Sequence, residues 1–473
     1  MDSVVSAVIA MAAAEIAATR TCVARDARGT RLYENVRELV PHILACAAGL
    51  LELDLRDHWI NHEVVSIMAA LTHTSVHTLT RLDLNCCNIK DPGAELVAEF
   101  VNAATALAVL DVGTNCMTHV GATRVLRAVA NSRTLASLNY GFSHTGMTTY
   151  THTAVVVQAL VTALAGCATL TELGVHGQYC DDAMAVALAE YLCARPARMT
   201  RLNFLRGAFG IAGWAAVTRI MKHSHQTMRD LAIGLGCFSR GADAQCILLA
   251  PPHCAALTTL SVHGFHPQVS ADFTREVVFA TLLRATTTLR DLDLDCVRFS
   301  ATTCELFTSA LAGNTSLVRL AVGGVSQCAG MGTMMAGALR RNKTLVELKI
   351  DCIDVDRASA LAFCDVLRPG ANTTLTKLNV SYHSMTEAGV WALAAMLRRR
   401  PQMEVMDVSG RVTEATHAVA AALRRCAENR KLLAFAGAFT PQKRPRTAAG
   451  RFVRADGDCS HAHRVAEFLV GGE

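Results

Sequence analysis

A six-residue frame with leucine-like side chains at its first, fourth and sixth positions recurs along almost the whole chain of 473 residues. The copies that start at Leu79, Leu107 and Leu135 are spaced by 28 residues each time. The frame starts at Leu50, Leu79, Leu107, Leu135, Leu170, Met199, Met228, Leu257, Leu289, Leu317, Leu345, Leu375 and Met403. A unit this short cannot bury an apolar face alone, so the copies must stack into a solenoid of about thirteen repeats.

Each repeat predicts a strand, a turn and a helix. The alternating leucines place one face of a short strand in a core and leave the residues between them outside. An apolar residue recurs at the eleventh position, as at Ile60 and Ile89, and apolar residues at helical spacing follow, as in 95–100. Strands about 4.8 Å apart that are joined to helices about 10 Å across make such a stack curve. We therefore expect an α/β horseshoe with parallel β-strands on the concave face and helices on the convex face.

In these features the chain resembles the ribonuclease-inhibitor-like subtype of leucine-rich repeat proteins over roughly residues 50 to 435. It shares the long repeat, the glycine early in the turn and the polar helix end, as at Gly93, Gly121, Gly389, Asn314, Asn342 and Asn372. At the ninth position, where the family places an Asn or Cys that bonds to the turn backbone, Cys87 and Asn115 follow the pattern. Other repeats depart from it, at His58, Gly207, Gly236, Phe265, Val297, Val325 and Ile353. We therefore expect regular strands and helices but irregular turns.

The composition divides the chain into three regions. Residues 1–49 begin with an apolar stretch and are expected to form an N-terminal helical cap, while arginines after that stretch make a mitochondrial presequence the alternative. Residues 50–438 carry the repeat array. Residues 439–473 are a basic, proline-broken C-terminal tail, in which 443–446 fits a linker or, alternatively, a nuclear-localisation patch. An N-terminal helix with an uncovered face would also suit a subunit of a larger assembly.

Charge and cysteine content limit the class of partner and the compartment. The formal net charge of +5 is close to balance for this length, so nucleic acid is not expected as a partner. No apolar run is long enough to span a membrane, so a membrane is not expected as a partner either.

The 18 cysteines are spread over a long chain and show few paired spacings. This indicates reduced thiols and a cytoplasmic protein, with the nucleus as the alternative. Cysteines just after the strands fit tight turns, and a zinc or redox site is the alternative.

The sequence contains no recognised motif for catalysis. It lacks a phosphate-binding loop, a nucleophile elbow and a zinc-protease helix, so we expect no catalytic, cofactor-binding or metal-binding residues. The resemblance implies a non-enzymatic protein–protein interaction scaffold or recognition module that uses the concave face. A GTPase-activating or other enzyme-regulating leucine-rich repeat protein is the alternative. The relative that has this activity carries an acidic tail, whereas the present tail is basic.

Charges on the expected concave face fall into columns, because parallel strands place equal positions side by side. In the third position of the frame the signs alternate, as at Glu52 and Arg81, so this column should neutralise itself.

In the fifth position, three consecutive strands carry Asp54, Asp83 and Asp111. A second acidic group contains Asp291, Asp293, Asp295 and Asp351. Like charges about 5 Å apart repel, so both groups are candidate docking points for a basic segment of a partner protein. Neutralisation by Arg56 and Arg81, or a solvated face alone, is the alternative.

Other side chains are candidate contacts for a protein partner. Anchors on the concave face are Phe142, His176, His263 and Tyr382. Two repeats are longer than the others, from Leu135 to Leu170 and from Leu257 to Leu289, so their extra residues must leave the solenoid as loops. The first loop contains Tyr150, a further candidate contact. Insertions on one face of a repeat protein often lie at binding surfaces, and sequence drift is the alternative.

Overall fold

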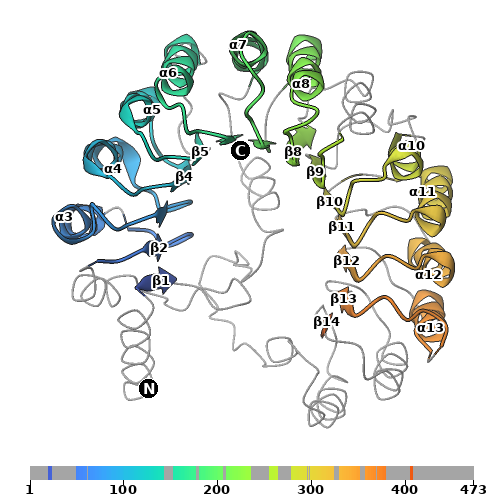
Figure 1. Ribbon diagram of the computed structural model, residues 1–473. Coiled ribbons are helices and arrows are strands. Elements are labelled where there is room, and N and C mark those ends of the chain that lie inside the picture. The colour runs from blue at the N-terminus through green and yellow to red at the C-terminus, as the bar shows by residue number, and fades with distance from the viewer. Residues whose placement is uncertain are drawn as a thin grey trace, which may run out of the picture. The chain divides into compact units, whose positions relative to one another are not determined.

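The computed structural model describes residues in two compact units, which divide between Met228 and Arg229. The described residues are 20–23, 49–60, 62–142, 153–176, 181–205, 209–235, 255–264, 278–295, 297, 299–323, 330–351, 357–368, 370–379 and 405–407. In each unit most of the short strands are followed along the chain by a helix. Within a unit, the helices lie on one side of the strands (Figure 1).

In unit 1 each strand pairs in parallel with the next one along the chain. The strands are β1 (Thr21–Val23), β2 (Glu52–Asp54), β3 (Arg81–Asp83), β4 (Val109–Asn115), β5 (Ser137–Phe142), β6 (Glu172–His176) and β7 (Arg201–Phe204). The helices are α3 (Val64–Thr74), α4 (Lys90–Ala103), α5 (His119–Asn131), α6 (Thr153–Gly166), α7 (Asp182–Cys193) and α8 (Ile211–His223). The face of the strands that is turned away from the helices is called the strand face below.

Unit 2 repeats the same parallel pairing. Its strands are β8 (Asp230–Leu235), β9 (Thr259–Gly264), β10 (Asp291–Asp295), β11 (Arg319–Gly323), β12 (Glu347–Asp351), β13 (Lys377–Asn379) and β14 (Val405–Asp407). Its described helices are α10 (Val278–Ala285), α11 (Ala301–Gly313), α12 (Met331–Arg341) and α13 (Arg357–Val366).

The repeat frame predicts the position of the strands correctly. Strands β2 to β14 all begin at the third residue of one of the thirteen frames, such as Glu52 in the frame that starts at Leu50. The predicted α/β solenoid with parallel strands is therefore confirmed. The sequence does not predict β1, which lies within the segment 1–49 and pairs with β2 through Thr21 and Glu52. The sheet of unit 1 thus begins one strand before the first frame.

The frame leucines form the core of each repeat. Leu50, Leu53 and Leu55 are all at most 1% exposed, because the first, fourth and sixth positions point between the strand and the helix layer. The apolar residue at the eleventh position closes the same core. Phe209 shows this, since its ring packs edge-on against Phe204, with centroids 5.7 Å apart, and against Trp214 at 5.3 Å.

A buried asparagine joins each helix to the next strand in three repeats of unit 2. In Asn342, the side-chain Nδ2 donates to the carbonyls of Leu311 (2.7 Å) and Asn314 (3.0 Å). Its Oδ1 accepts from the backbone N–H groups of Thr344 (3.0 Å) and Leu345 (2.8 Å). The asparagines of this ladder are Asn314, Asn342 and Asn372. Each satisfies backbone groups of its own repeat and of the preceding one, which explains the polar helix end of the repeat.

Aspartates at two helix starts in unit 1 bind the start of the next repeat's helix. Asp91 of α4 accepts from the backbone N–H of Thr118 at 2.7 Å and from that of Gly121 at 3.2 Å. Asp182 of α7 accepts from the backbone N–H of Gly210 at 2.7 Å, just before α8. A carboxylate at a helix N-terminus satisfies donors that the helix itself leaves open.

The two repeats that keep the family's ninth residue have hydrogen-bonded turns. Asn115 Oδ1 accepts from the backbone N–H of Cys87 (3.0 Å) and of Ile89 (3.2 Å), and its Nδ2 donates to Leu84 O at 2.7 Å. The Cys87 thiol donates to Leu55 O at 2.9 Å. Burial raises the pKa of the Cys87 thiol well above its ordinary value. The predicted role of this position is therefore confirmed in these repeats, and Cys87 is a neutral structural side chain.

Candidate functional site

Three aspartates stand side by side on the strand face of unit 1. The parallel register pairs Asp54 with Asp83 and Asp83 with Asp111, and the next strand places Asn139 beside Asp111. We call Asp54, Asp83 and Asp111 the acidic column. The side-by-side arrangement expected from the frame positions is confirmed, because equal positions of parallel strands are neighbours.

An arginine lies between two members of the acidic column. Nη2 of Arg56 is 2.5 Å from Asp54 Oδ2, and Nε of Arg56 is 3.2 Å from Asp83 Oδ2. Arg81 reaches the same Asp83 oxygen at 3.3 Å. Asp54 and Asp83 are only 4% and 1% exposed. Burial of these two carboxylates is tolerable because the guanidinium groups compensate their charge.

Asp111 is held by neutral donors instead. Nδ2 of Asn85 donates to Asp111 Oδ1 at 3.0 Å, and Nδ2 of Asn139 donates to Oδ2 at 2.7 Å. The backbone N–H of Gly113 donates to Oδ1 at 2.9 Å. The sequence predictions omitted both asparagines, although they occupy the seventh and fifth positions of neighbouring frames. Polar amides in the columns of the carboxylates are the signal that identifies them.

The surroundings of Asp83 in the acidic column raise its pKa. Burial raises the pKa of Asp83 to about 7, and the neighbouring carboxylates of Asp111 and Asp54 act in the same direction. The positive charge of Arg56 and the backbone N–H of Asn85 act in the opposite direction. The hydrogen bond to Asp54 in turn raises the pKa of Arg56, so this cation stays charged. The column is a compact, partly neutralised hydrogen-bond network with Arg56 at its surface.

The acidic group of unit 2 is more exposed to solvent than the acidic column of unit 1. Asp293 has a side chain that is 44% exposed, and its Oδ2 lies 3.4 Å from Nε2 of His263. Asp291 binds the guanidinium of Arg319, which donates from Nη2 at 2.9 Å. Asp295 is half-buried on the same strand, β10. The structure thus brings together Asp291, Asp293, Asp295 and His263, all of which are predicted contact residues.

The third column behaves as its alternating signs predict. Arg201 binds Glu172 at 3.3 Å in unit 1, and Lys377 lies 3.8 Å from Glu347 in unit 2. These pairs are solvent-exposed, so each contributes only about 0 to 1 kcal/mol. This column largely satisfies itself.

The remaining predicted contact residues lie at strand ends or outside the described residues. The backbone positions of Phe142, His176 and Asp351 fall at the ends of β5, β6 and β12. Their side chains are not part of the described structure. Tyr150 and Tyr382 lie outside the described residues.

Within the ranges given above, no three His, Cys, Asp or Glu side chains gather in a way that could hold a metal ion. None of the described helices is both long and apolar enough to cross a membrane. In the described part of the chain, seven cysteines are not in disulfide bonds, namely Cys22, Cys86, Cys87, Cys116, Cys167, Cys193 and Cys364. Cys304 is disulfide-bonded, so the expectation of reduced thiols is wrong at that position.

Comparison with known proteins agrees with the repeat. A family model described as "Leucine Rich repeat" matches residues 77–98 and 371–394. No match was found among curated proteins. Taken with the thirteen frames and their parallel strands, these family-model matches support a leucine-rich repeat fold for the chain.

Three solved structures are similar to parts of the chain. Leiomodin-1 actin-binding site 2 has 18% sequence identity and a TM-score of 0.26, over 34% of this chain and 91% of that chain. The tropomodulin C-terminal domain of Caenorhabditis elegans has 16% identity and a TM-score of 0.28, over 33% and 90%. The Rad7 and Elc1 complex of yeast has 12% identity and a TM-score of 0.38, over 68% and 79%.

Proposed function

We propose that this chain is a non-enzymatic protein-interaction module that binds a partner protein through its strand face. The observation that carries this proposal is the acidic group on β10, where the side chain of Asp293 is 44% exposed beside Asp291 and Asp295. A row of parallel strands presents such side chains on a rigid surface, which repeat proteins use for binding. The ribonuclease-inhibitor-like subtype remains part of this proposal.

The partner that suits this group carries a basic segment. Three carboxylates on one strand attract a cation, and the exposed Asp293 is the carboxylate that a partner can reach. Asp291 already binds Arg319, so it contributes less free charge. His263 at the edge of the group offers an imidazole that is 29% exposed.

The acidic column of unit 1 suits a different kind of contact. Its two most buried carboxylates, Asp54 and Asp83, are compensated by Arg56, whose side chain is 42% exposed. A partner would therefore meet guanidinium and amide groups, from Arg56, Arg81 and Asn85, rather than three bare carboxylates. We propose that this surface contributes hydrogen bonds and specificity to binding at unit 1, and that the acidic group of unit 2 contributes electrostatic attraction to binding at unit 2.

A charge-reversal experiment tests the proposal. The tagged full chain and its Asp293→Lys variant are used to capture partners from native lysate, with quantification by mass spectrometry. The control is Glu305→Lys, which makes the same charge change at an exposed position of α11, on the helix side of the same unit. Thermal melting of all three proteins checks that folding is equal.

The proposal predicts one stoichiometric protein that wild type and Glu305→Lys retain and Asp293→Lys loses. The same protein should dissociate as the salt concentration rises, because exposed charges are screened. Equal recovery by all three proteins would remove the strand face of unit 2 as the binding surface.

A further inference from the structure

Helix α6 carries no Asp, Glu, Lys or Arg, a feature that among the described helices of unit 1 it shares with α3. Its sequence from Thr153 to Gly166 contains neither acid nor base, and yet it is a surface helix. The exposed side chains on it are Ala154, Val155, Gln158, Thr162 and Ala165. A surface helix ordinarily places charged residues on its outer face, so the uncharged outer face of α6 is a candidate surface for a partner.

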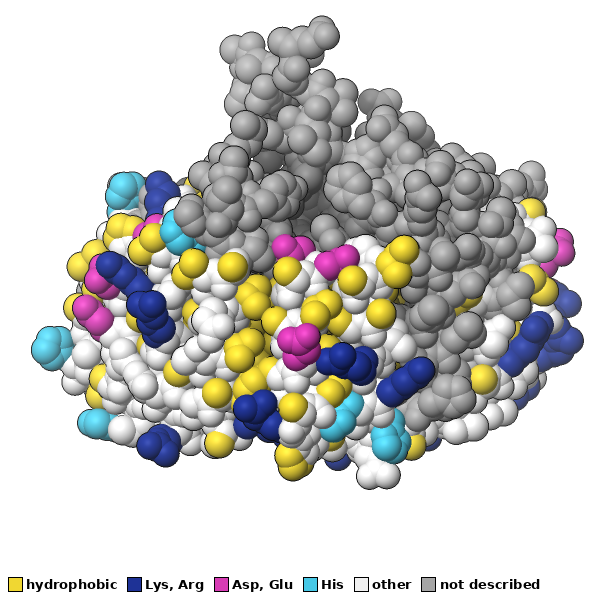
Figure 2. Space-filling view, turned by 90° about the horizontal axis from the view of Figure 1, so that it is seen from above, with side chains coloured by type: hydrophobic (Ala, Val, Ile, Leu, Met, Phe, Trp, Pro, Cys, Tyr) yellow, Lys and Arg dark blue, Asp and Glu magenta, His cyan; other side chains and the backbone are white. Residues whose placement is uncertain are grey.

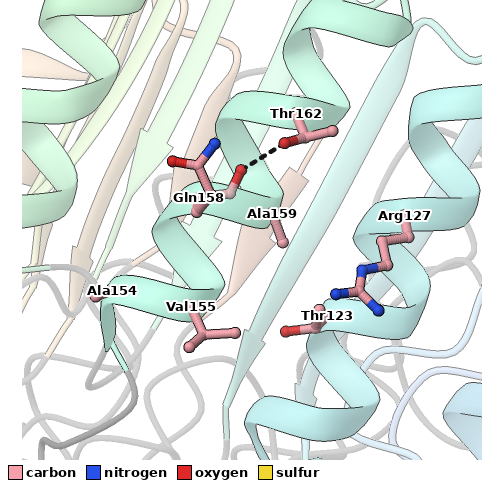
Figure 3. Close-up of a pocket in the computed structure, with 7 residues that line it drawn as sticks. All are labelled: Thr123, Arg127, Ala154, Val155, Gln158, Ala159 and Thr162. Carbon is pink, nitrogen blue, oxygen red and sulfur yellow. Dashed lines mark hydrogen bonds between the residues drawn. The ribbon is translucent and has the colours of Figure 1, made fainter.

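A groove runs between α6 and the preceding helix, α5. It has a volume of about 360 Å³ and is lined by Thr123, Arg127, Ala154, Val155, Gln158, Ala159 and Thr162. Figure 3 shows Thr123 and Arg127 on α5 facing Val155 and Ala159 on α6. Hydrophobic side chains are exposed among scattered Lys and Arg on the helix side seen in Figure 2. The groove is therefore an apolar depression with a cation on one wall.

The cation of the groove has no counter-charge among the described residues. One turn earlier on α5, Arg124 forms an ion pair with Glu95 of α4. Arg127 is exposed and faces α6, which has no carboxylate to offer. No ion pair or hydrogen bond joins it to any described residue. An arginine beside an apolar surface is a ready partner for a carboxylate of another molecule.

A second polar group in the groove also lacks a partner. The hydroxyl of Thr123 belongs to a residue that is only 7% exposed, and no described residue accepts or donates a hydrogen bond to it. The other threonine, Thr162, is different, because its hydroxyl donates to Gln158 O at 2.8 Å (Figure 3). Burying a hydroxyl without a partner costs free energy, but the oxygen of Thr123 is itself almost fully buried, so the cation of Arg127 is the polar group of the groove that a partner can reach.

We propose that the α5–α6 groove is a second docking site, which binds a segment of a partner protein that carries an apolar side chain next to a carboxylate. The apolar side chain lies against Val155 and Ala159, and the carboxylate binds Arg127. This is a surface of the helix side of unit 1, and it is independent of the strand face. A peptide segment fits better than a small molecule because the exposed Val120, at 42%, extends the apolar surface beyond the groove.

Three variants of the full chain separate the groove from its surroundings. Arg127→Glu reverses the charge of the groove, whereas Arg133→Glu makes the same change at an exposed position after α5 and outside the groove. Val155→Glu replaces a side chain that is 47% exposed and offers Arg127 a carboxylate from within the chain. These substitutions are at exposed positions, so each variant should melt like wild type.

The probe is a random peptide library displayed on phage and panned on the immobilised wild-type chain. Enriched peptides are synthesised, and their affinities for all four proteins are measured by fluorescence polarisation. We expect enrichment of Asp or Glu close to Leu, Met or Phe. We also expect at least about tenfold weaker binding by Arg127→Glu and Val155→Glu, and unchanged binding by Arg133→Glu. Replacing the peptide carboxylate by Lys should restore binding to Arg127→Glu.

Other results would overturn the proposal. Peptides without an acidic excess, or peptides that bind Arg127→Glu and Arg133→Glu equally, would show that the groove does not select a carboxylate. Binding of decanoate that Val155→Glu abolishes, with no peptide enriched, would assign the groove to a small amphiphile. A concentration-dependent dimer of wild type that Val155→Glu abolishes would assign it to a second copy of the chain.

Discussion

The guanidinium of Arg56 lies between the carboxylates of Asp54 and Asp83, 2.5 Å from the first and 3.2 Å from the second. The two aspartates are almost fully buried, while the arginine side chain is 42% exposed. The cation thus forms the outer layer of a charge network whose acidic layer lies beneath it. This order explains how the sheet tolerates like charges on adjacent strands.

Replacement of Arg56 by methionine should destabilise unit 1. The change leaves Asp54 and Asp83 buried without their shared cation, and breaking a buried pair costs about 3 to 5 kcal/mol. The exposure of Arg56 places the expected loss at the lower end of that range. Chemical denaturation of wild type and Arg56→Met measures it.

The control for Arg56 is Arg81→Met. Arg81 contacts only Asp83 in this network, at 3.3 Å, so the expected loss is smaller. Adding Asp83→Asn to Arg56→Met should recover part of the stability, because it removes one uncompensated charge. Equal losses for the two arginine variants would contradict the bridging role of Arg56.

The protonation of Asp83 predicts how stability depends on pH. Its pKa is about 7 in the folded chain, compared with about 3.9 for an ordinary aspartate. The folded state therefore binds more protons than the unfolded state between about pH 4 and pH 7. Stability from this group is present at low pH and falls as pH rises through that window, by at most about 1.4 kcal/mol per pH unit.

The variant Asp83→Asn isolates this contribution. Asparagine cannot titrate, and its side-chain oxygen can still accept from the backbone N–H of Asn85, as Asp83 does at 3.2 Å. The variant should therefore gain stability relative to wild type as pH rises from 4.5 to 7.5. A constant difference in unfolding free energy across that range would show that burial and the carboxylates of Asp111 and Asp54 do not raise the pKa of Asp83 in this way.

The sequence predicts which residues share a column, but it does not predict how deeply their side chains are buried. Frame positions determine which residues share a face and which are neighbours, so the register of Asp54, Asp83 and Asp111 follows from the repeat alone. Whether a side chain on that face is buried depends on its neighbours in three dimensions, here Arg56. The repeat also does not predict β1, because Thr21–Val23 lacks the leucine frame. The groove beside Arg127 depends on packing between two helices that the frame positions do not describe.

Removal of Asn342 should weaken unit 2 at the junction of two repeats. The change to alanine leaves four backbone groups without the side chain, namely the carbonyls of Leu311 and Asn314 and the N–H groups of Thr344 and Leu345. A buried group without a partner costs about 1 to 3 kcal/mol, so we expect a loss of at least about 2 kcal/mol.

Asn102→Ala is the control for this ladder. Asn102 accepts a hydrogen bond from Asn131 at an exposed position, so its removal should change stability by less than about 0.5 kcal/mol. Denaturant titration of both variants gives the comparison. Similar small changes in both would mean that the asparagine ladder does not stabilise the repeat junction.

Gly121 should respond to alanine in the opposite way from an ordinary helical glycine. Glycine to alanine within a helix usually stabilises by about 0.5 to 1 kcal/mol. A Cβ on Gly121, however, would lie 2.5 Å from Asp91 Oδ1 and 3.2 Å from Asp91 Cα. The carboxylate would have to move, and it would lose its hydrogen bonds to the backbone of Thr118 and Gly121. We therefore expect Gly121→Ala to destabilise unit 1.

Two comparisons distinguish this clash from a general effect of alanine. Gly337→Ala in α12 places its Cβ in open space, with no heavy atom within 4 Å, so it should stabilise the chain. In an Asp91→Ala background, Gly121→Ala should cost much less, because the displaced carboxylate is gone. Melting temperatures of the single and double variants give the coupling between the two sites. Additive effects would show that Asp91 does not require glycine at the start of the next helix.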